Sequence, residues 1–138
     1  MASDQLENSI ITRLIDGNGY LMSPDATYYV SLHTADPGDT GTNELPSTNG
    51  YARKSYTTSG GWNAASGGST SNNGSITFAA ASGGDWATAT HFGIWNNAAG
   101  TSANFMLGGA LTSSVTCTDG DAVQFLGGTP GALVITCT

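Results

Sequence analysis

The sequence predicts an all-β protein, an antiparallel β-sandwich or jelly-roll-like domain with one N-terminal amphipathic helix. Short runs of β-branched and aromatic residues recur along most of the 138 residues, and Gly, Asn, Asp and Pro separate them at intervals of about 8 to 12 residues. A helical period occurs only near the N-terminus. The chain has the length of one typical domain, so we assign residues 1–138 to a single unit.

The N-terminal region 1–18 is expected to form the helix or a helical arm. Asp4 followed by Glu7 resembles a capping box, which favours a helix start at this point. The apolar residues that follow recur at helical spacing and would form one stripe: Leu6, Ile10, Ile11, Leu14 and Ile15. An isolated helix of this length is marginal in water, so the stripe must pack on the sheet of the same chain or on a neighbouring subunit.

Later segments have the composition of strands. In the first of them, Tyr28, Val30 and Leu32 would share one face. We expect strands at residues 27–34, 51–58, 75–79, 88–95, 104–111, 114–118, 122–125 and 133–137. Hairpin turns are expected at residues 96–100, 119–121 and 129–131.

Two segments without periodicity are expected to be loops. Residues 35–50 contain Asp-Pro-Gly, Asp-Thr-Gly and Leu-Pro-Ser, and a loop of this length inside a small domain is usually functional or disordered. Residues 66–74 are low in complexity and rich in Ser, Gly and Asn, which predicts a flexible exposed loop.

Charge and hydropathy exclude several classes of protein. The chain has 3 Lys and Arg against 10 Asp and Glu, a formal charge of −7, whereas nucleic-acid binding needs a clustered basic face. No apolar run approaches the roughly 20 residues of a membrane span, and the N-terminus resembles no secretion signal. We therefore expect synthesis in a cytoplasm, with neither nucleic acid nor membrane as a partner.

The low content of charged residues is typical of a protein that works inside an assembly. Charged residues are 9% of the sequence, where roughly a quarter is usual. Ser, Thr, Asn and Gly lose less side-chain entropy than Lys, Glu or Arg when a surface becomes buried. Contact surfaces made of such residues therefore cost little to order.

Nothing in the sequence predicts an active site. His33 and His91 lie in expected strands, and no Ser lies in a Gly-x-Ser-x-Gly elbow. Ordinary strand packing or interface hydrogen bonding explains both histidines better than catalysis, because a general base needs a tuned partner. Cys117 and Cys137 have no Cys-x-x-Cys spacing, which leaves two buried reduced thiols or a disulfide between C-terminal strands.

Two binding hypotheses remain, each beside a structural one. Asp36, Asp39 and Glu44 on the long loop could supply oxygen ligands to Ca²⁺, although their spacing matches no EF-hand and a solvated acidic loop explains them as well. The larger aromatic residues could form a sugar-stacking face or fill the core and subunit seams: Trp62, Trp86, Trp95, Tyr51 and Tyr56.

Four phrases read in order carry a resemblance to a known family. They are residues 29–38 (YVSLHTADPG), 50–53 (GYAR), 90–95 (THFGIW) and 108–111 (GGAL). Together with the N-terminal helix and a Ser/Gly-rich stretch ending in Ile-Thr-Phe, they resemble a family of small virion structural proteins of tailed bacteriophages. Members carry tail-fibre, minor tail or head-decoration labels, and the resemblance spans nearly the whole chain.

The resemblance implies a virion structural protein without enzymatic activity or cofactor. We expect a capsid decoration, or cement, protein that forms homo-oligomers, as trimers, on the outside of the head and contacts the major capsid protein or other virion proteins. The alternatives are a tail-fibre or minor tail component and a carbohydrate-binding module. Residues 4–16 or the loop 35–50 are the expected arms that reach neighbouring subunits.

Physical roles are also expected for two residues of these phrases. Arg53 should pair with a carboxylate of the Asp36 and Asp39 loop, because a guanidinium suits bidentate pairing. Gly93 lies between two large apolar residues of a strand, which is typical of a close approach by another backbone or a ring. The structural and interface candidates are Leu6, Ile10, Ile11, Leu14, His33, Asp36, Asp39, Tyr51, Arg53, His91, Phe92, Gly93 and Trp95.

Overall fold

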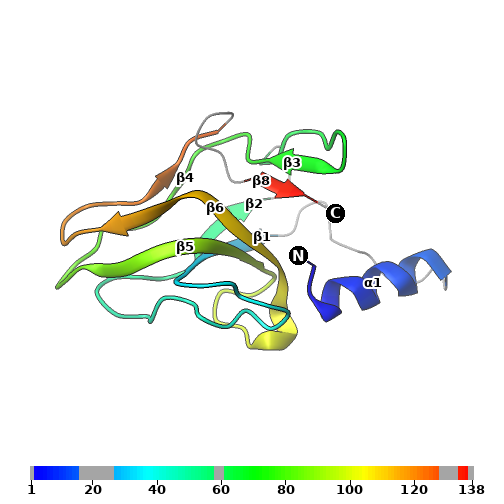
Figure 1. The fold of residues 1–138 in the computed structure, drawn as a ribbon, viewed down its shortest axis with the longest axis horizontal. Helices are drawn as coiled ribbons and strands as arrows, with labels where there is room; N and C mark the ends of the chain where they lie inside the picture. The colour runs from blue at the N-terminus through cyan, green and yellow to red at the C-terminus, as the bar shows by residue number, and fades with distance from the viewer. Residues whose placement is uncertain (1, 16–26, 58–60, 128–133, 137–138) are drawn as a thin grey trace.

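The computed structural model describes residues 2–15, 27–57, 61–127 and 134–136, and it is the all-β fold that the sequence predicts. One helix precedes antiparallel strands that form a four-stranded sheet and two small two-stranded sheets (Figure 1). The elements are α1 (Asp4–Ile15), β1 (Thr27–His33), β2 (Lys54–Thr57), β3 (Ser69–Ser71), β4 (Ile76–Thr77), β5 (Trp86–Trp95), β6 (Phe105–Cys117), β7 (Gln124–Phe125) and β8 (Val134–Thr136), with a 3-10 turn, η1 (Ser102–Asn104), before β6.

The four-stranded sheet has the order β2-β1-β5-β6, and the small sheets pair β3 with β8 and β4 with β7. β5 and β6 form a hairpin whose connection spans residues 96–104, as the Asn-rich turn predicts. The register of β1 against β5 places His33 opposite His91 and Leu32 opposite Phe92. The long segment between β1 and β2 therefore starts beside His91 of β5.

The main core lies on one face of the four-stranded sheet. Val30 and Leu32 of β1 and Phe92 and Ile94 of β5 alternate toward it, and all four are at most 3% exposed. Residues of the small sheets and of the connecting segments close this core from the other side, among them Ile76, Phe78, Val123 and Phe125. The predicted alternation of Tyr28, Val30 and Leu32 is confirmed, because all three belong to this core.

The opposite face of the same sheet is buried as well. Ser31 and His33 of β1 are 0% exposed, and Trp95 and Phe105, which are paired across β5 and β6, are 2% and 0% exposed. The segment that follows β1 covers them. Pro37 of that segment is itself among the most buried residues. The long loop therefore covers the second face of the sheet and does not project freely into solvent.

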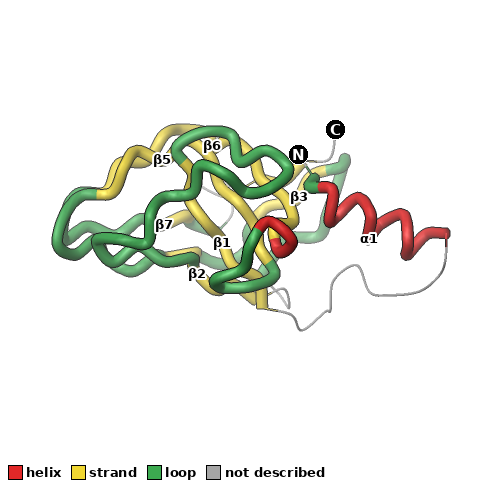
Figure 2. Tube along the Cα trace, turned by 90° about the horizontal axis from the view of Figure 1, so that it is seen from below, coloured by secondary structure: helices red, strands yellow, loops and turns green. Residues whose placement is uncertain are grey.

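The helix α1 is confirmed, but its cap is Ser3 and not Asp4. Ser3 Oγ accepts a hydrogen bond from the Leu6 amide at 3.3 Å and donates to the carbonyl oxygens of Phe105 and Met106. Ser3 N also donates to Met106 O, so the start of the helix is tied to the edge of β6. Beyond this anchor α1 extends away from the sheets (Figures 1 and 2).

Several predicted boundaries are wrong. The segment 66–74 contains strand β3 where a flexible loop was expected; short polar strands lack the apolar alternation that marks a strand. The two strands expected at 104–111 and 114–118 are one strand, β6, with a large register shift between them. Residues 119–121 form a turn, but the strands it joins pair with different partners, so it is not a hairpin.

The remaining predicted strands are shorter than expected or lie partly outside the described residues. The strand expected at 51–58 is reduced to β2, and the two at 75–79 and 122–125 to the two-residue strands β4 and β7. Cys117 is a buried free thiol, in agreement with the reduced alternative. Cys137 and the turn at 129–131 lie outside the described residues.

Candidate functional site

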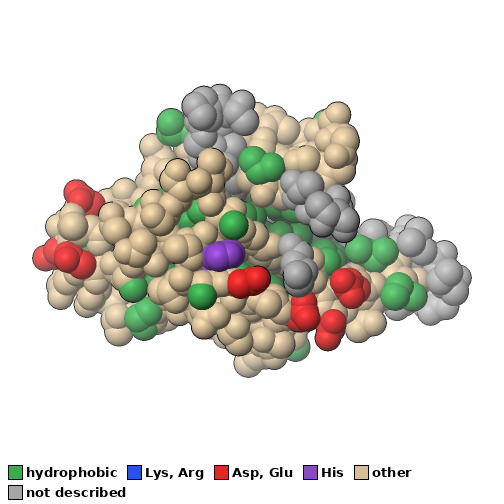
Figure 3. Space-filling view, in the orientation of Figure 1, with side chains coloured by type: hydrophobic (Ala, Val, Ile, Leu, Met, Phe, Trp, Pro, Cys, Tyr) green, Lys and Arg blue, Asp and Glu red, His purple; other side chains and the backbone are tan. Residues whose placement is uncertain are grey.

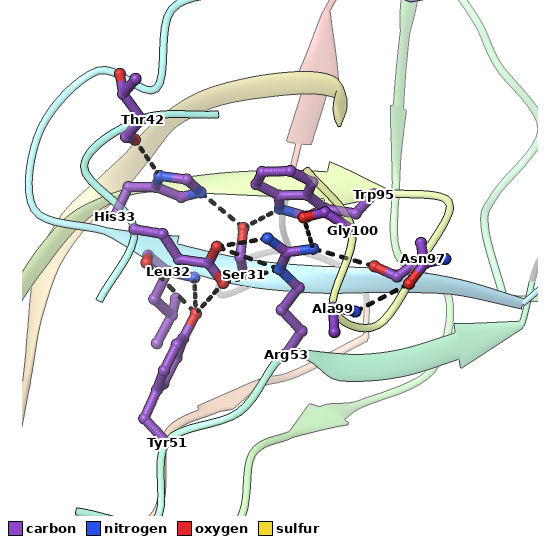
Figure 4. Close-up of polar contacts among 11 residues, drawn as sticks. Ser31, Leu32, His33, Thr42, Tyr51, Arg53, Trp95, Asn97, Ala99 and Gly100 are labelled. Carbon is purple, nitrogen blue, oxygen red and sulfur yellow. Dashed lines mark hydrogen bonds and ion pairs between the residues drawn. The ribbon is translucent and has the colours of Figure 1, made fainter. Parts of the chain in front are cut away.

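The phrases of the sequence that carry the family resemblance converge under the loop 34–50, on the second face of the four-stranded sheet. Two hydrogen-bond networks meet there, and Figure 4 shows them side by side. We call them the histidine chain, made of Trp95, Ser31, His33 and Thr42, and the arginine clamp, made of Arg53, Glu44 and Tyr51.

The histidine chain runs from β5 through β1 to the long loop. Trp95 Nε1 donates to Ser31 Oγ at 2.7 Å, and Ser31 Oγ lies 2.7 Å from His33 Nε2. His33 Nδ1 lies 2.7 Å from the carbonyl oxygen of Thr42. A carbonyl can only accept, so Nδ1 carries the proton, and Nε2 accepts the Ser31 hydroxyl proton. When the imidazole is neutral, each donated proton in the histidine chain has one acceptor.

Burial favours that neutral state of His33. The side chain is 0% exposed, and burial lowers its pKa from the usual 6.5, with smaller effects from its charged neighbours. The bond to Thr42 and the charge of Glu44 act in the opposite direction, while Arg53 and His91 act with burial. The fold therefore holds His33 as a neutral hydrogen-bond bridge.

The arginine clamp joins three parts of the chain that are distant in sequence. Arg53 Nε and one terminal nitrogen bind the Glu44 carboxylate, with N to O distances of 2.9 Å and 2.7 Å. The other terminal nitrogen donates to the carbonyl oxygens of Asn97 and Gly100, at 3.1 Å and 3.2 Å. One guanidinium thus fixes the long loop and the β5–β6 turn at the same time.

Arg53 also connects the clamp to the histidine chain. Its guanidinium carbon lies 3.4 Å from the centre of the Trp95 ring, a cation–π contact in which the ring covers one face of the charge. The side chains of Arg53 and Glu44 are 10% and 20% exposed. Removing either partner would leave a largely desolvated charge without its counter-ion.

Tyr51 anchors the clamp to β1. Its hydroxyl oxygen accepts from the Leu32 amide at 2.9 Å, and its proton faces Glu44 Oε1 at 3.3 Å. Burial raises the pKa of Tyr51 well above 10, and the Glu44 charge acts in the same direction. The ring also packs edge-on against Trp86 in the main core, so Tyr51 spans both faces of the sheet edge.

Close packing around these networks requires glycine at set positions. A Cβ on Gly93 would come within 2.7 Å of both His33 Nε2 and Ser31 Oγ, and within 2.8 Å of the Phe105 ring. A Cβ on Gly41 would lie 2.3 Å from the Trp95 ring, and Gly41 has a φ of 72°. The expected close approach at Gly93 is confirmed, and the neighbours are the histidine chain itself.

The structure brings together most of the residues singled out in the sequence phrases. His33, Tyr51, Arg53, Gly93 and Trp95 belong to the two networks or contact them. His91 is half-buried on the same face, and its Nδ1 lies 2.8 Å from the Thr90 hydroxyl. Phe92 points to the opposite face and belongs to the main core.

The acidic residues of the loop behave differently from expectation. Arg53 pairs with Glu44 and not with Asp36 or Asp39, because Glu44 itself lies opposite His33, where the loop returns to the sheet. Asp36 Oδ1 accepts from Gly38 N at 2.9 Å within its own turn, and Asp39 is exposed. Within the described ranges, no three His, Cys, Asp or Glu side chains form a group that could hold a metal ion.

The helix residues lie apart from this site. Leu6 and Ile10 are half-buried, and Ile11 is 59% exposed. The side chain of Leu14 lies outside the described part of the structure. The helix contacts the sheets mainly through β6, and Ile11 is the member of the stripe that is exposed among the side chains that can be described.

The Ser31 and His33 pair has the spacing of a nucleophile and its base, but it is not placed for that chemistry. Both side chains are 0% exposed, and Nδ1 faces a carbonyl oxygen instead of a carboxylate. Substrate has no access to the hydroxyl. The pair is better explained as an internal bridge between the sheet and the loop.

The proposed sugar-stacking face of five aromatic residues does not form. Trp86 and Trp95 are 7% and 2% exposed and Tyr51 is 4% exposed, so these three belong to the interior. Trp62 and Tyr56 are half-buried and pack edge-on, with ring centres 5.7 Å apart. The interpretation of the tryptophans as packing residues therefore fits Trp86 and Trp95.

Four members of the site did not stand out in the sequence. Ser31 and Thr42 are common polar residues, Thr42 takes part through its backbone, and Phe105 reads as an ordinary strand residue. In the sequence, Glu44 is a candidate metal ligand, and nothing marks it as the partner of Arg53. The one signal for Ser31 was its place between Val30 and Leu32, on the face that carries His33.

The surface of the molecule is polar but weakly charged. Figure 3 shows a face of mostly neutral polar atoms on which acidic side chains form separate groups, with no Lys or Arg side chain visible. Among the described residues, no helix has both the length and the apolar character that crossing a membrane requires.

Comparison with known proteins places the chain in a family. No curated protein matches it. A family model matches residues 1–133, which include the helix, the long loop and both networks described above. The description of that family is podophage GP4 fiber I protein gp80, so the chain belongs to a family of phage fibre proteins and is a virion structural protein.

Proposed function

We propose that the chain is a component of a phage fibre, and that it acts through contacts with copies of itself and with other virion proteins, without catalysis or a cofactor. The observation that carries this proposal is the family match over residues 1–133, whose description names a fibre protein. The match gives the fibre alternative more support than the capsid decoration role that the sequence favoured.

The site geometry supports a structural role. The two networks use their polar groups internally, and they fix the long loop and the β5–β6 turn in one arrangement. These two fixed loops, with few charges to desolvate, form a surface that can be buried at low entropic cost. Self-association, as a trimer or another homo-oligomer, is part of the same proposal.

Copy number in purified virions tests the proposal. We expect quantitative mass spectrometry to find a small number of copies of this protein for each hundred copies of the major capsid protein, and labelled antibodies to bind at the tail. Near-stoichiometric amounts with label over the whole head would contradict the fibre assignment and support decoration. Absence from intact particles would contradict both.

A further inference from the structure

We propose that the histidine chain is an acid-sensitive latch: a proton on His33 releases the segment 34–45 from the four-stranded sheet while the rest of the sheet stays folded. The proposal goes beyond the fibre role and does not depend on it. It rests on the geometry around the imidazole, where both ring nitrogens have partners and Nε2 already accepts the Ser31 hydroxyl proton.

The conflict arises at Ser31. In the neutral chain Ser31 Oγ accepts the Trp95 indole proton and gives its own proton to His33 Nε2, with both distances 2.7 Å. A protonated imidazole would place a second N–H against the same oxygen, whose hydroxyl proton would then need another acceptor. Ser31 and His33 are both 0% exposed, so solvent does not reach Oγ to supply one.

The groups around the ring do not resolve this conflict. The titratable and charged side chains that act on His33 are Glu44 from the loop, Arg53 from the segment before β2, and His91 from β5. Glu44 favours a charged imidazole, but its carboxylate is engaged by Arg53 at 2.7 Å. β6 contributes only the uncharged ring of Phe105, with ring centres 6.2 Å apart. The imidazolium can be hydrated only if the cover over it moves.

The cover that can move is the long loop. His33 Nδ1 binds it at Thr42, and the backbone bonds Thr34 N to Asn43 O and Leu45 N to Leu32 O close its two ends, each at 2.9 Å. The other face of the ring is held by β5 and β6, which form the longest strand pair of the sheet. Opening on the loop side breaks these bonds and the Glu44–Arg53 pair, whereas opening on the sheet side would separate β1 from β5 along five residue pairs.

Hydrogen exchange as a function of pH tests the latch. After correction for intrinsic rates, we expect protection of the amides in 34–45 to fall up to tenfold for each pH unit below about 6.5, the slope of one proton, while the β5–β6 hairpin keeps its protection. In His33→Gln, which cannot take up a proton, this slope should disappear. His91→Gln, which removes the half-buried histidine of the same face, should keep it.

Two outcomes would overturn the proposal. One is a response in 34–45 that persists in His33→Gln, which would assign the effect to another group. The other is a His33 ring that titrates at or above the ordinary imidazole pKa of 6.5 in the unmodified protein, measured by NMR with His91→Gln used to assign the two signals. The second measurement needs no change at His33, so it remains decisive if His33→Gln does not fold.

Discussion

Gly93 lies where the backbone of β5 passes between the histidine chain and the Phe105 ring, and its Cα faces atoms that a side chain would displace. Its neighbours are held from three directions, by β1, by β6 and by the long loop. Packing at this position therefore controls both the sheet and the lid that covers it.

Substituting Gly93 with Ala should destabilise the protein by about 1 to 3 kcal/mol, because the new methyl group would overlap His33 and Ser31. Gly109 on the neighbouring strand is a suitable control, since its Cβ would meet only the Phe92 ring, at 3.1 Å. Urea unfolding of Gly93→Ala and Gly109→Ala measures the difference. Equal midpoints for the two variants would show that the close approach at Gly93 can relax freely.

Removing the Arg53 side chain should destabilise the protein more than removing that of its neighbour Lys54. Arg53→Ala leaves Glu44 without its counter-ion and frees the Asn97 and Gly100 carbonyls, a change that typically costs about 3 kcal/mol for a buried pair. Lys54 on β2 is half-buried and forms no ion pair within the described residues, so Lys54→Ala should change stability by about 0.5 kcal/mol or less. Thermal melts of both variants compare the two cations directly.

The raised pKa of Tyr51 predicts that the protein loses stability in alkali. Its pKa is raised in the folded protein, so the folded state keeps the phenol proton after the unfolded chain has lost it. The stabilising contribution is complete below pH 10 and decreases as pH rises above that value. Denaturant unfolding between pH 8 and pH 11 should show this decrease in the unmodified protein and a smaller one in Tyr51→Phe.

At the scale of single elements, α1 depends on one serine at its start. Ser3 caps the helix and also binds two carbonyl oxygens of β6, so it determines both where α1 begins and where it is attached. The spacing of Asp4 and Glu7 predicted the helix correctly but placed its cap one residue too late.

We expect Ser3→Ala to weaken α1 without unfolding the sheets. Loss of the cap should cost about 1 kcal/mol, and the two β6 carbonyls would lose a donor. Hydrogen exchange should accelerate in residues 4–15 and stay unchanged in β5. Ser102→Ala, at an exposed position of η1, is the matched control and should leave both regions unaffected.

The strands illustrate which elements a sequence can reveal. β1 and β5 were predicted closely because their apolar residues alternate in front of a real core. β3 was missed because Ser-Thr-Ser carries no such alternation, and its partner β8 is far away in sequence. The partition of 104–118 into two strands was wrong as secondary structure, although the proposed break falls where the register shifts.

At the scale of the whole molecule, the convergence of the site was only partly predictable. The phrases around His33, Arg53 and Trp95 pointed to structural importance, and all three meet under the loop. The partner of Arg53 could not be chosen from sequence, because Asp36, Asp39 and Glu44 are equally acidic and only the path of the loop separates them. The burial of the second face of the sheet likewise could not be predicted without knowing the path of the loop.

The exposed side chain of Ile11 on α1 predicts a contact between copies. Ile11 is 59% exposed on a helix that extends from the body, so Ile11→Ser should leave the melting temperature of the single chain nearly unchanged. If this stripe is covered in the assembly, the same change should shift native mass spectra toward the monomer. Asn8→Ser, an exposed polar position on the same helix, is the control. An identical oligomer in both variants would exclude the stripe as the contact.

The register shift in β6 affects the edge of the four-stranded sheet. His91 is opposite Ala110 and Ala89 is opposite Val115, so the residues 111–114 bulge out opposite a single residue of β5. β6 is an edge strand without a charged residue, and edge strands of this kind invite uncontrolled sheet extension by other chains. A bulge bends such an edge and interrupts its ladder of amides and carbonyls. The irregularity therefore makes this edge a poorer template for sheet extension by another chain.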